Sequence, residues 1–144
     1  MRQFFVAAAI VLALSAFKLD QLTQQWNMTI HARSVSINSS TLVMSDVNDL
    51  VMLMSSGGER EMKMVNLSKV IQNWNTTFNS SEPNAVVSTI IDGQVYEVVV
   101  LLGQPKLVNQ KLTFPIKQLG VEKSFQGKEA VLYIDGAHLA PSKQ

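Results

Sequence analysis

Apolar and polar residues alternate through most of this chain, and the pattern predicts a β-rich protein. Residues 29–37 alternate loosely, as a half-buried strand does. Two apolar runs, 85–91 and 95–102, flank Asp92-Gly93, a dipeptide typical of a type I′ hairpin turn. We predict a last strand over residues 130–135 and a frayed tail from Gly136.

One segment has a different period and predicts a helix over residues 66–78. Its apolar positions recur at spacings of three and four, which places them on one helix face: Leu67, Val70, Ile71, Trp74 and Phe78. Asn66 or Ser68 can cap its start by accepting a backbone N–H. A helix with one apolar face needs a surface to cover. We therefore predict an α+β fold with a mostly antiparallel sheet that forms either a sandwich or a partial barrel. This one amphipathic helix would cover the sheet.

The start of the chain resembles an export signal. Arg2 precedes fourteen residues, 4–17, in which Ser15 alone is not apolar. As a helix this run would be about 21 Å long, which is short for a bilayer core of roughly 30 Å. We predict a signal peptide over residues 1–16, cleaved after Ala16, and a single β-rich domain over 17–144. The alternative is an uncleaved N-terminal helix that anchors the protein in the membrane, facing the periplasm.

Charge and cysteine content narrow the classes of function. The full chain has 12 Lys and Arg against 11 Asp and Glu, so loss of Arg2 leaves 11 of each (12 − 1 = 11). A neutral domain argues against nucleic acid as a partner, because nucleic acid requires a basic surface. The absence of cysteine excludes thiol catalysis and cysteine-bound metal clusters. Together with the export signal, it favours a periplasmic or secreted bacterial protein.

The methionines raise the question of copper, because thioethers suit Cu(I). The continuous apolar run 50–54 predicts a strand buried on both faces, and Gly57-Gly58 predicts a two-residue hairpin turn. In that register the numbers of opposite residues sum to 115. Met52 and Met54 would then lie on the other face from Met62 and Met64. We therefore predict that these side chains, with Met44, pack in the core, and we predict no metal or cofactor.

No catalytic constellation is recognisable in the sequence, so we predict that the protein is not an enzyme. His31 and His138 are far apart, and neither has a second ligand at metal-binding spacing. The residue of most interest is Trp74, either as the core anchor of the helix or as the floor of a small binding pocket beside Asn84 and Arg60.

The second half of the chain contains a series of short segments that are characteristic when taken together: Trp74, Pro83-Asn84-Ala85-Val86, Leu102, Pro105, Leu112-Thr113-Phe114 and Val131-Leu132-Tyr133-Ile134-Asp135. In these residues the chain resembles a family of small, exported, β-rich bacterial proteins of uncharacterised function. The resemblance spans roughly residues 65–135 and implies an exported, β-rich single domain. In that family an aromatic-Asp-Arg-Pro segment follows an early strand, whereas this chain has residues 53–60 there, without that motif.

These observations predict a non-catalytic binding or accessory protein of the bacterial envelope that acts through protein–protein contact. The sheet surface, an edge strand or a retained N-terminus would make the contact, and the partner would be another envelope protein or a second copy of the chain. One alternative is a carrier of a small apolar ligand, held in a pocket between helix and sheet. The other is a membrane-anchored accessory subunit of a larger complex.

Overall fold

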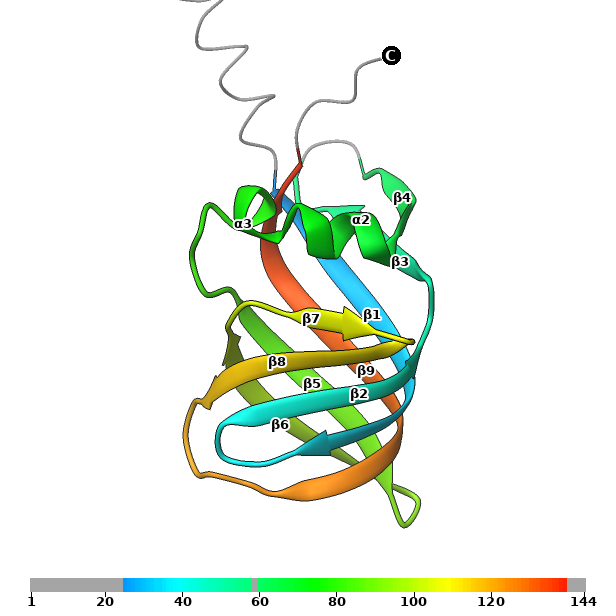
Figure 1. Cartoon of the computed structure of the whole chain (residues 1–144), viewed down its shortest axis with the longest axis vertical. Coiled ribbons are helices and arrows are strands. Elements are labelled where there is room, and N and C mark those ends of the chain that lie inside the picture. The colour runs from blue at the N-terminus through cyan, green and yellow to red at the C-terminus, as the bar shows by residue number, and fades with distance from the viewer. Residues whose placement is uncertain (1–24, 58–59, 140–144) are drawn as a thin grey trace, which may run out of the picture.

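The computed structural model describes residues 25–57 and 60–139, and these form a mostly antiparallel sheet with two short helices (Figure 1). The predicted signal segment, residues 1–16, lies outside the described residues. In the part described, no helix is both long and apolar enough to cross a membrane. The elements are β1 (Gln25–Ile37), β2 (Thr41–Val47), β3 (Leu50–Ser55), β4 (Met62–Asn66), α2 (Leu67–Gln72), α3 (Trp74–Thr77), β5 (Asn84–Ile91), β6 (Gln94–Leu102), β7 (Lys106–Val108), β8 (Lys111–Gln118) and β9 (Phe125–His138).

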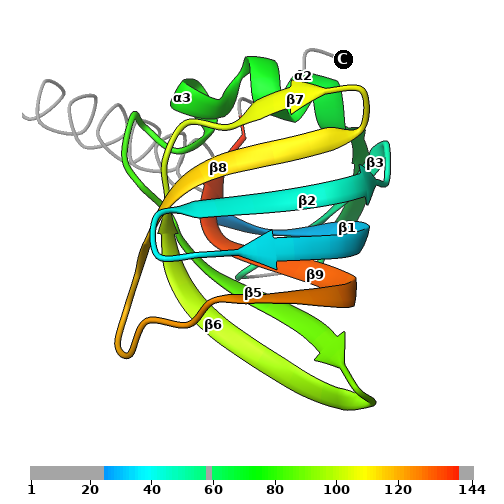
Figure 2. The same cartoon turned by 60° about the horizontal axis from the view of Figure 1, so that its bottom comes forward.

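Six of the strands pair in a partly closed ring. The order β1-β2-β8-β6-β5-β9 returns to β1, and each pairing is antiparallel. Figure 2 shows the strands curving around a common interior. Between β6 and β8 the pairing covers residues 100–102 and 116–118, so the ring is joined there at one end. The β3–β4 hairpin continues the sheet from the first half of β1. Of the two predicted arrangements, the structure therefore has the partial ring.

The hydrophobic core fills the inside of this ring. Alternate residues of each strand point inward, as in β8, where the buried positions are Leu112, Phe114 and Ile116. The predicted strands 85–91 and 95–102 correspond to β5 and β6, joined at Asp92-Gly93. Both turn residues have positive φ, as a type I′ turn requires.

The prediction of one continuous helix over residues 66–78 is wrong, because the helix is interrupted. The segment forms two very short helices, α2 and α3, which meet at Asn73 and lie over one end of the ring (Figure 1). The Asn73 side-chain Nδ2 donates to the Lys69 carbonyl oxygen, 3.0 Å away, which also accepts from the Asn73 backbone N–H. This side-chain bond competes with regular helix at that point. The predicted cap is confirmed, because Asn66 Oδ1 accepts from the Ser68 backbone N–H at 2.9 Å.

The predicted end of the last strand is also wrong. β9 begins at Phe125 and continues to His138, so residues from Gly136 to His138 belong to the sheet. The reason is tertiary, because β9 pairs with β1 along the whole length of both strands, from Ile37 opposite Phe125 to Gln25 opposite His138. Ala137 is fully buried in this pairing.

Candidate functional site

The outer face of the sheet carries a continuous row of mostly apolar side chains. Here the outer face means the solvent side of β6, β5, β9, β1, β3 and β4, opposite the core. Pairing registers place one residue of each strand directly beside the next across all six strands. We call these residues the apolar row: Val99, Val86, Tyr133, Thr29, Met52 and Met64.

The apolar row is accessible to solvent. Val99 is 42% exposed, Tyr133 40% and Met64 53%, and the other three members are partly buried. Ile90 and Val95, which pair with each other on the same face, are exposed as well. Scattered apolar residues are normal on a protein surface, but a contiguous exposed patch marks a place for contact with another molecule.

The register of the β3–β4 hairpin corrects the predicted placement of the methionines. Met52 lies opposite Met64 and Met54 opposite Met62, so opposite residues sum to 116 rather than 115. The shift arises at the turn. The Ser55 backbone N–H donates to the Glu61 carbonyl at 3.0 Å, and the Glu61 N–H donates to Ser55 Oγ at 2.8 Å. These bonds close the hairpin at 55 and 61, so the turn is longer than Gly57-Gly58.

This one-residue shift brings four methionines to the outer face, where they form a cluster that we call the methionine quartet. Met62 is 64% exposed, Met64 53% and Met54 42%, whereas Met52 is partly buried. The prediction that these side chains pack in the core is therefore wrong, and so is the prediction of a strand over 50–54 that is buried on both faces. The prediction holds for Met44, which is fully buried.

Exposure predicts the order in which the methionines oxidise. Dilute hydrogen peroxide is expected to convert Met62 and Met64 to the sulfoxide before Met28 and Met44, because the latter two are fully buried in the folded protein. Peptide mapping by mass spectrometry after timed exposure measures each site. A sample unfolded in urea is the control, in which the four rates should converge. Equal rates in the folded protein would contradict the described hairpin register.

A depression of about 510 Å³ lies on the outer face between the apolar row and the β3–β4 turn. Asn27 Oδ1 is buried there and accepts no hydrogen bond from the described residues. Desolvation, followed by the nearby charge of Asp135, raises the pKa of the Tyr133 phenol, a group that is neutral at physiological pH even without this shift. The lining residues are Asn27, Thr29, Met54, Ser55, Ser56, Gly57, Arg60 and Tyr133.

The structure places the three predicted pocket residues in different surroundings. Arg60 lines the depression just described, and Asn84 lines another one, of about 320 Å³, beside Asp135. Trp74 is 2% exposed, and its ring lies 4.4 Å from that of Phe78 and 5.4 Å from that of Phe114, centroid to centroid. Trp74, the first residue of α3, is thus buried in the core and anchors the short helices there, which is the first of its two predicted roles.

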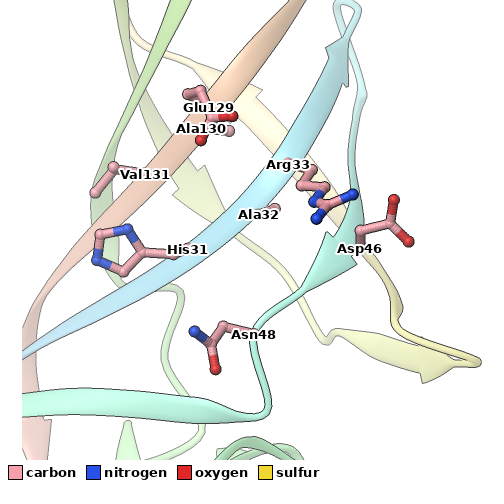
Figure 3. A pocket seen from close by; sticks show the side chains of 8 residues that line it. All are labelled: His31, Ala32, Arg33, Asp46, Asn48, Glu129, Ala130 and Val131. Atoms are coloured by element: carbon pink, nitrogen blue, oxygen red, sulfur yellow. The ribbon is translucent and has the colours of Figure 1, made fainter.

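A depression of about 300 Å³, lined by several charged side chains, lies beside the middle of β1 (Figure 3). The pairing of β1 with β2 and β9 places Arg33 between Asp46 on β2 and Glu129 on β9, so a cation lies between two carboxylates. His31 lines the same depression. Within residues 25–57 and 60–139, no group of three or more His, Cys, Asp or Glu side chains is arranged to hold a metal ion. Arg33, Asp46 and Glu129 together carry a charge of −1 (1 − 2 = −1), and we interpret this depression as a charged part of the surface in which Arg33 offsets one of the two carboxylates.

Comparison with protein-family models, with curated proteins and with solved structures finds no match to this chain. The resemblance noted above from residues 65–135 therefore stays a prediction, and function has to be argued from the surface itself.

Sequence reasoning missed Asn27, Val86, Val99 and Tyr133 as members of the candidate site. Strand alternation contains a usable signal, because each of these residues occupies an outward position of its strand. The pattern does not reveal which outward positions of different strands become neighbours, because that depends on strand order and register.

Proposed function

We propose that this protein is a non-catalytic binding protein of the bacterial envelope, exported by its N-terminal segment, that holds a partner protein against the outer face of its sheet. The observation that carries the proposal is the apolar row, which crosses six strands and stays exposed. All its members except Thr29 are apolar or aromatic, a composition suited to the centre of a protein interface. The partner is another envelope protein or a second copy of the chain.

The sheet face supports this role better than the free edge of β6 does. Beyond its pairing with β8, that edge is partly covered, because the Leu119 backbone N–H donates to the Val99 carbonyl at 2.9 Å. Lys123 Nζ lies 3.5 Å from the Glu97 carbonyl oxygen. Lys123 belongs to the loop between β8 and β9, so this loop covers part of the edge, and a covered edge does not readily add a further strand. The proposed contact is therefore made by side chains of the face.

Site-specific photo-crosslinking tests the proposal in the native cell envelope. A photoreactive amino acid at position 86, which lies in the apolar row between Val99 and Tyr133, should give one dominant crosslinked product. The same group at Lys111, an exposed position on β8 outside the outer face, is the matched control and should give none. The double variant Val99→Ser/Tyr133→Ser should abolish the product at position 86. The proposal is wrong if positions 86 and 111 give the same products, or if the double variant leaves them unchanged.

A further inference from the structure

The methionine quartet has the geometry of a ligand set. Met52 and Met64 are directly opposite, as are Met54 and Met62, and both pairs lie on one face of the hairpin. Directly opposite Cβ atoms lie roughly 4.5–5.5 Å apart and diagonal ones about 7–8 Å. An ion above the centre of the four would therefore be about 4 Å from each Cβ in projection. The sulfur of methionine is two bonds beyond Cβ on a flexible chain, so the four sulfurs can converge on that point.

The surroundings leave the sulfurs accessible. Lys63, between Met62 and Met64 in sequence, points to the other side of β4, where its Nζ lies 5.1 Å from the centroid of the Trp26 ring. The lysine charge is thus held against an aromatic face, away from the quartet. Exposure of Met54, Met62 and Met64 leaves room for their side chains to change rotamer without disturbing the core.

Chemistry selects the kind of ion. Thioether sulfur is a soft, neutral ligand, and soft ligands favour Cu(I) over Mg²⁺, Ca²⁺ or Mn²⁺. The full chain contains no cysteine, so no thiolate competes with the thioethers for a soft ion.

We propose that Met52, Met54, Met62 and Met64 form a surface site for a monovalent soft metal ion, Cu(I) in particular. This inference rests on the sulfurs of the β3–β4 hairpin, whereas the proposed partner contact rests on the exposed apolar surface of the row. The two sites share Met52 and Met64 but depend on different properties of these side chains. Ag(I) is the suitable first probe, since it has the same charge and softness and does not change oxidation state in air.

Nuclear magnetic resonance of protein labelled with ¹³C at the methionine ε-methyl groups tests the site directly. Addition of silver nitrate should move the signals of the quartet and reach saturation at one ion per chain. The signals of Met28 and Met44, which are fully buried, should stay in place. The proposal is overturned if no quartet signal moves, or if all methionine signals move together without saturation. This measurement uses the unaltered protein, so it does not depend on the folding of a variant.

A competition experiment with variants measures the affinity. Met62→Leu/Met64→Leu keeps apolar volume and removes two sulfurs. It should weaken Cu(I) binding, measured anaerobically against a chromogenic Cu(I) chelator, by more than the roughly 10- to 100-fold typical of losing an outer-shell partner. Met44→Leu is the matched control and should bind as the unaltered protein does. Tyr133→Ser should also leave the Cu(I) affinity unchanged while it weakens the proposed partner contact. This variant therefore allows one proposal to be refuted without the other. Unchanged affinity in the double variant would refute the site.

Discussion

Replacement of Trp74 by alanine is expected to lower the free energy of unfolding by about 3–5 kcal/mol, the usual range for removing a large aromatic side chain from a core. Trp74 is 2% exposed and contacts Phe78 and Phe114, so the variant leaves a cavity between α3 and the ring. The two helices are too short to be stable by themselves and depend on this packing. Urea unfolding followed by circular dichroism measures the change.

The exposed neighbour Asn75 provides the control for Trp74→Ala. Asn75→Ala alters the same short helix on its solvent side and should change the free energy of unfolding by less than about 0.5 kcal/mol. If Trp74→Ala were as mild as Asn75→Ala, the tryptophan would not be the anchor of the helices, and a loosely packed space beneath them would again suit the carrier alternative.

Gly127→Ala is expected to destabilise the protein by about 1–3 kcal/mol, the range for overpacking a closely packed region. A Cβ at position 127 would lie 2.6 Å from Thr89 Cγ2 and closer still to Thr89 Oγ1. Thr89 cannot easily move away, because it is buried and its hydroxyl donates to the Lys128 carbonyl at 2.8 Å. Glycine is therefore required here for close approach of β9 to β5. Thermal unfolding measures the loss.

Two further variants test the cause of the effect at position 127. Gly57→Ala is the matched control, since a Cβ there would meet no atom within 4 Å, and its stability should stay close to that of the unaltered protein. Thr89→Ala removes Oγ1 and Cγ2, the two closest of the three Thr89 atoms that would crowd a Cβ at position 127. The double variant Thr89→Ala/Gly127→Ala should therefore lose less stability than the sum of the two single variants. Strict additivity would show that the contact between these residues is not the cause.

The methionine quartet shows that the length of a single turn can decide which face of a hairpin its side chains occupy. With a two-residue turn at Gly57-Gly58, the same four residues would be divided between the two faces of the hairpin. The bonds between Ser55 and Glu61 lengthen the turn and shift the register by one residue. Because side chains alternate with a period of two, a shift of one residue moves every side chain of one strand to the other face relative to its partner strand. A one-residue change in the pairing of β3 with β4 therefore decides whether these four methionines are divided between two faces or gathered in the proposed metal site.

Local interactions made part of this protein predictable from sequence. The turn at Asp92-Gly93, the cap at Asn66 and the apolar face from Leu67 to Phe78 depend on residues close together in the chain, and all three are present in the structure. The alternating pattern likewise predicted an antiparallel sheet as the main element. Such features can be read from sequence because backbone preference and side-chain period act over a few residues.

The tertiary structure alone decided the features on which the proposed partner contact and metal site rest. Partial closure of the ring, extension of β9 to His138 and the shifted pairing of β3 with β4 each depend on contacts between segments far apart in the chain. The same contacts select which outward residues become neighbours, and so they assemble the apolar row and the methionine quartet. Sequence periodicity determines which side of a strand is apolar, but strand order and register are set by the summed packing of the whole core, to which each local pattern contributes only a small part.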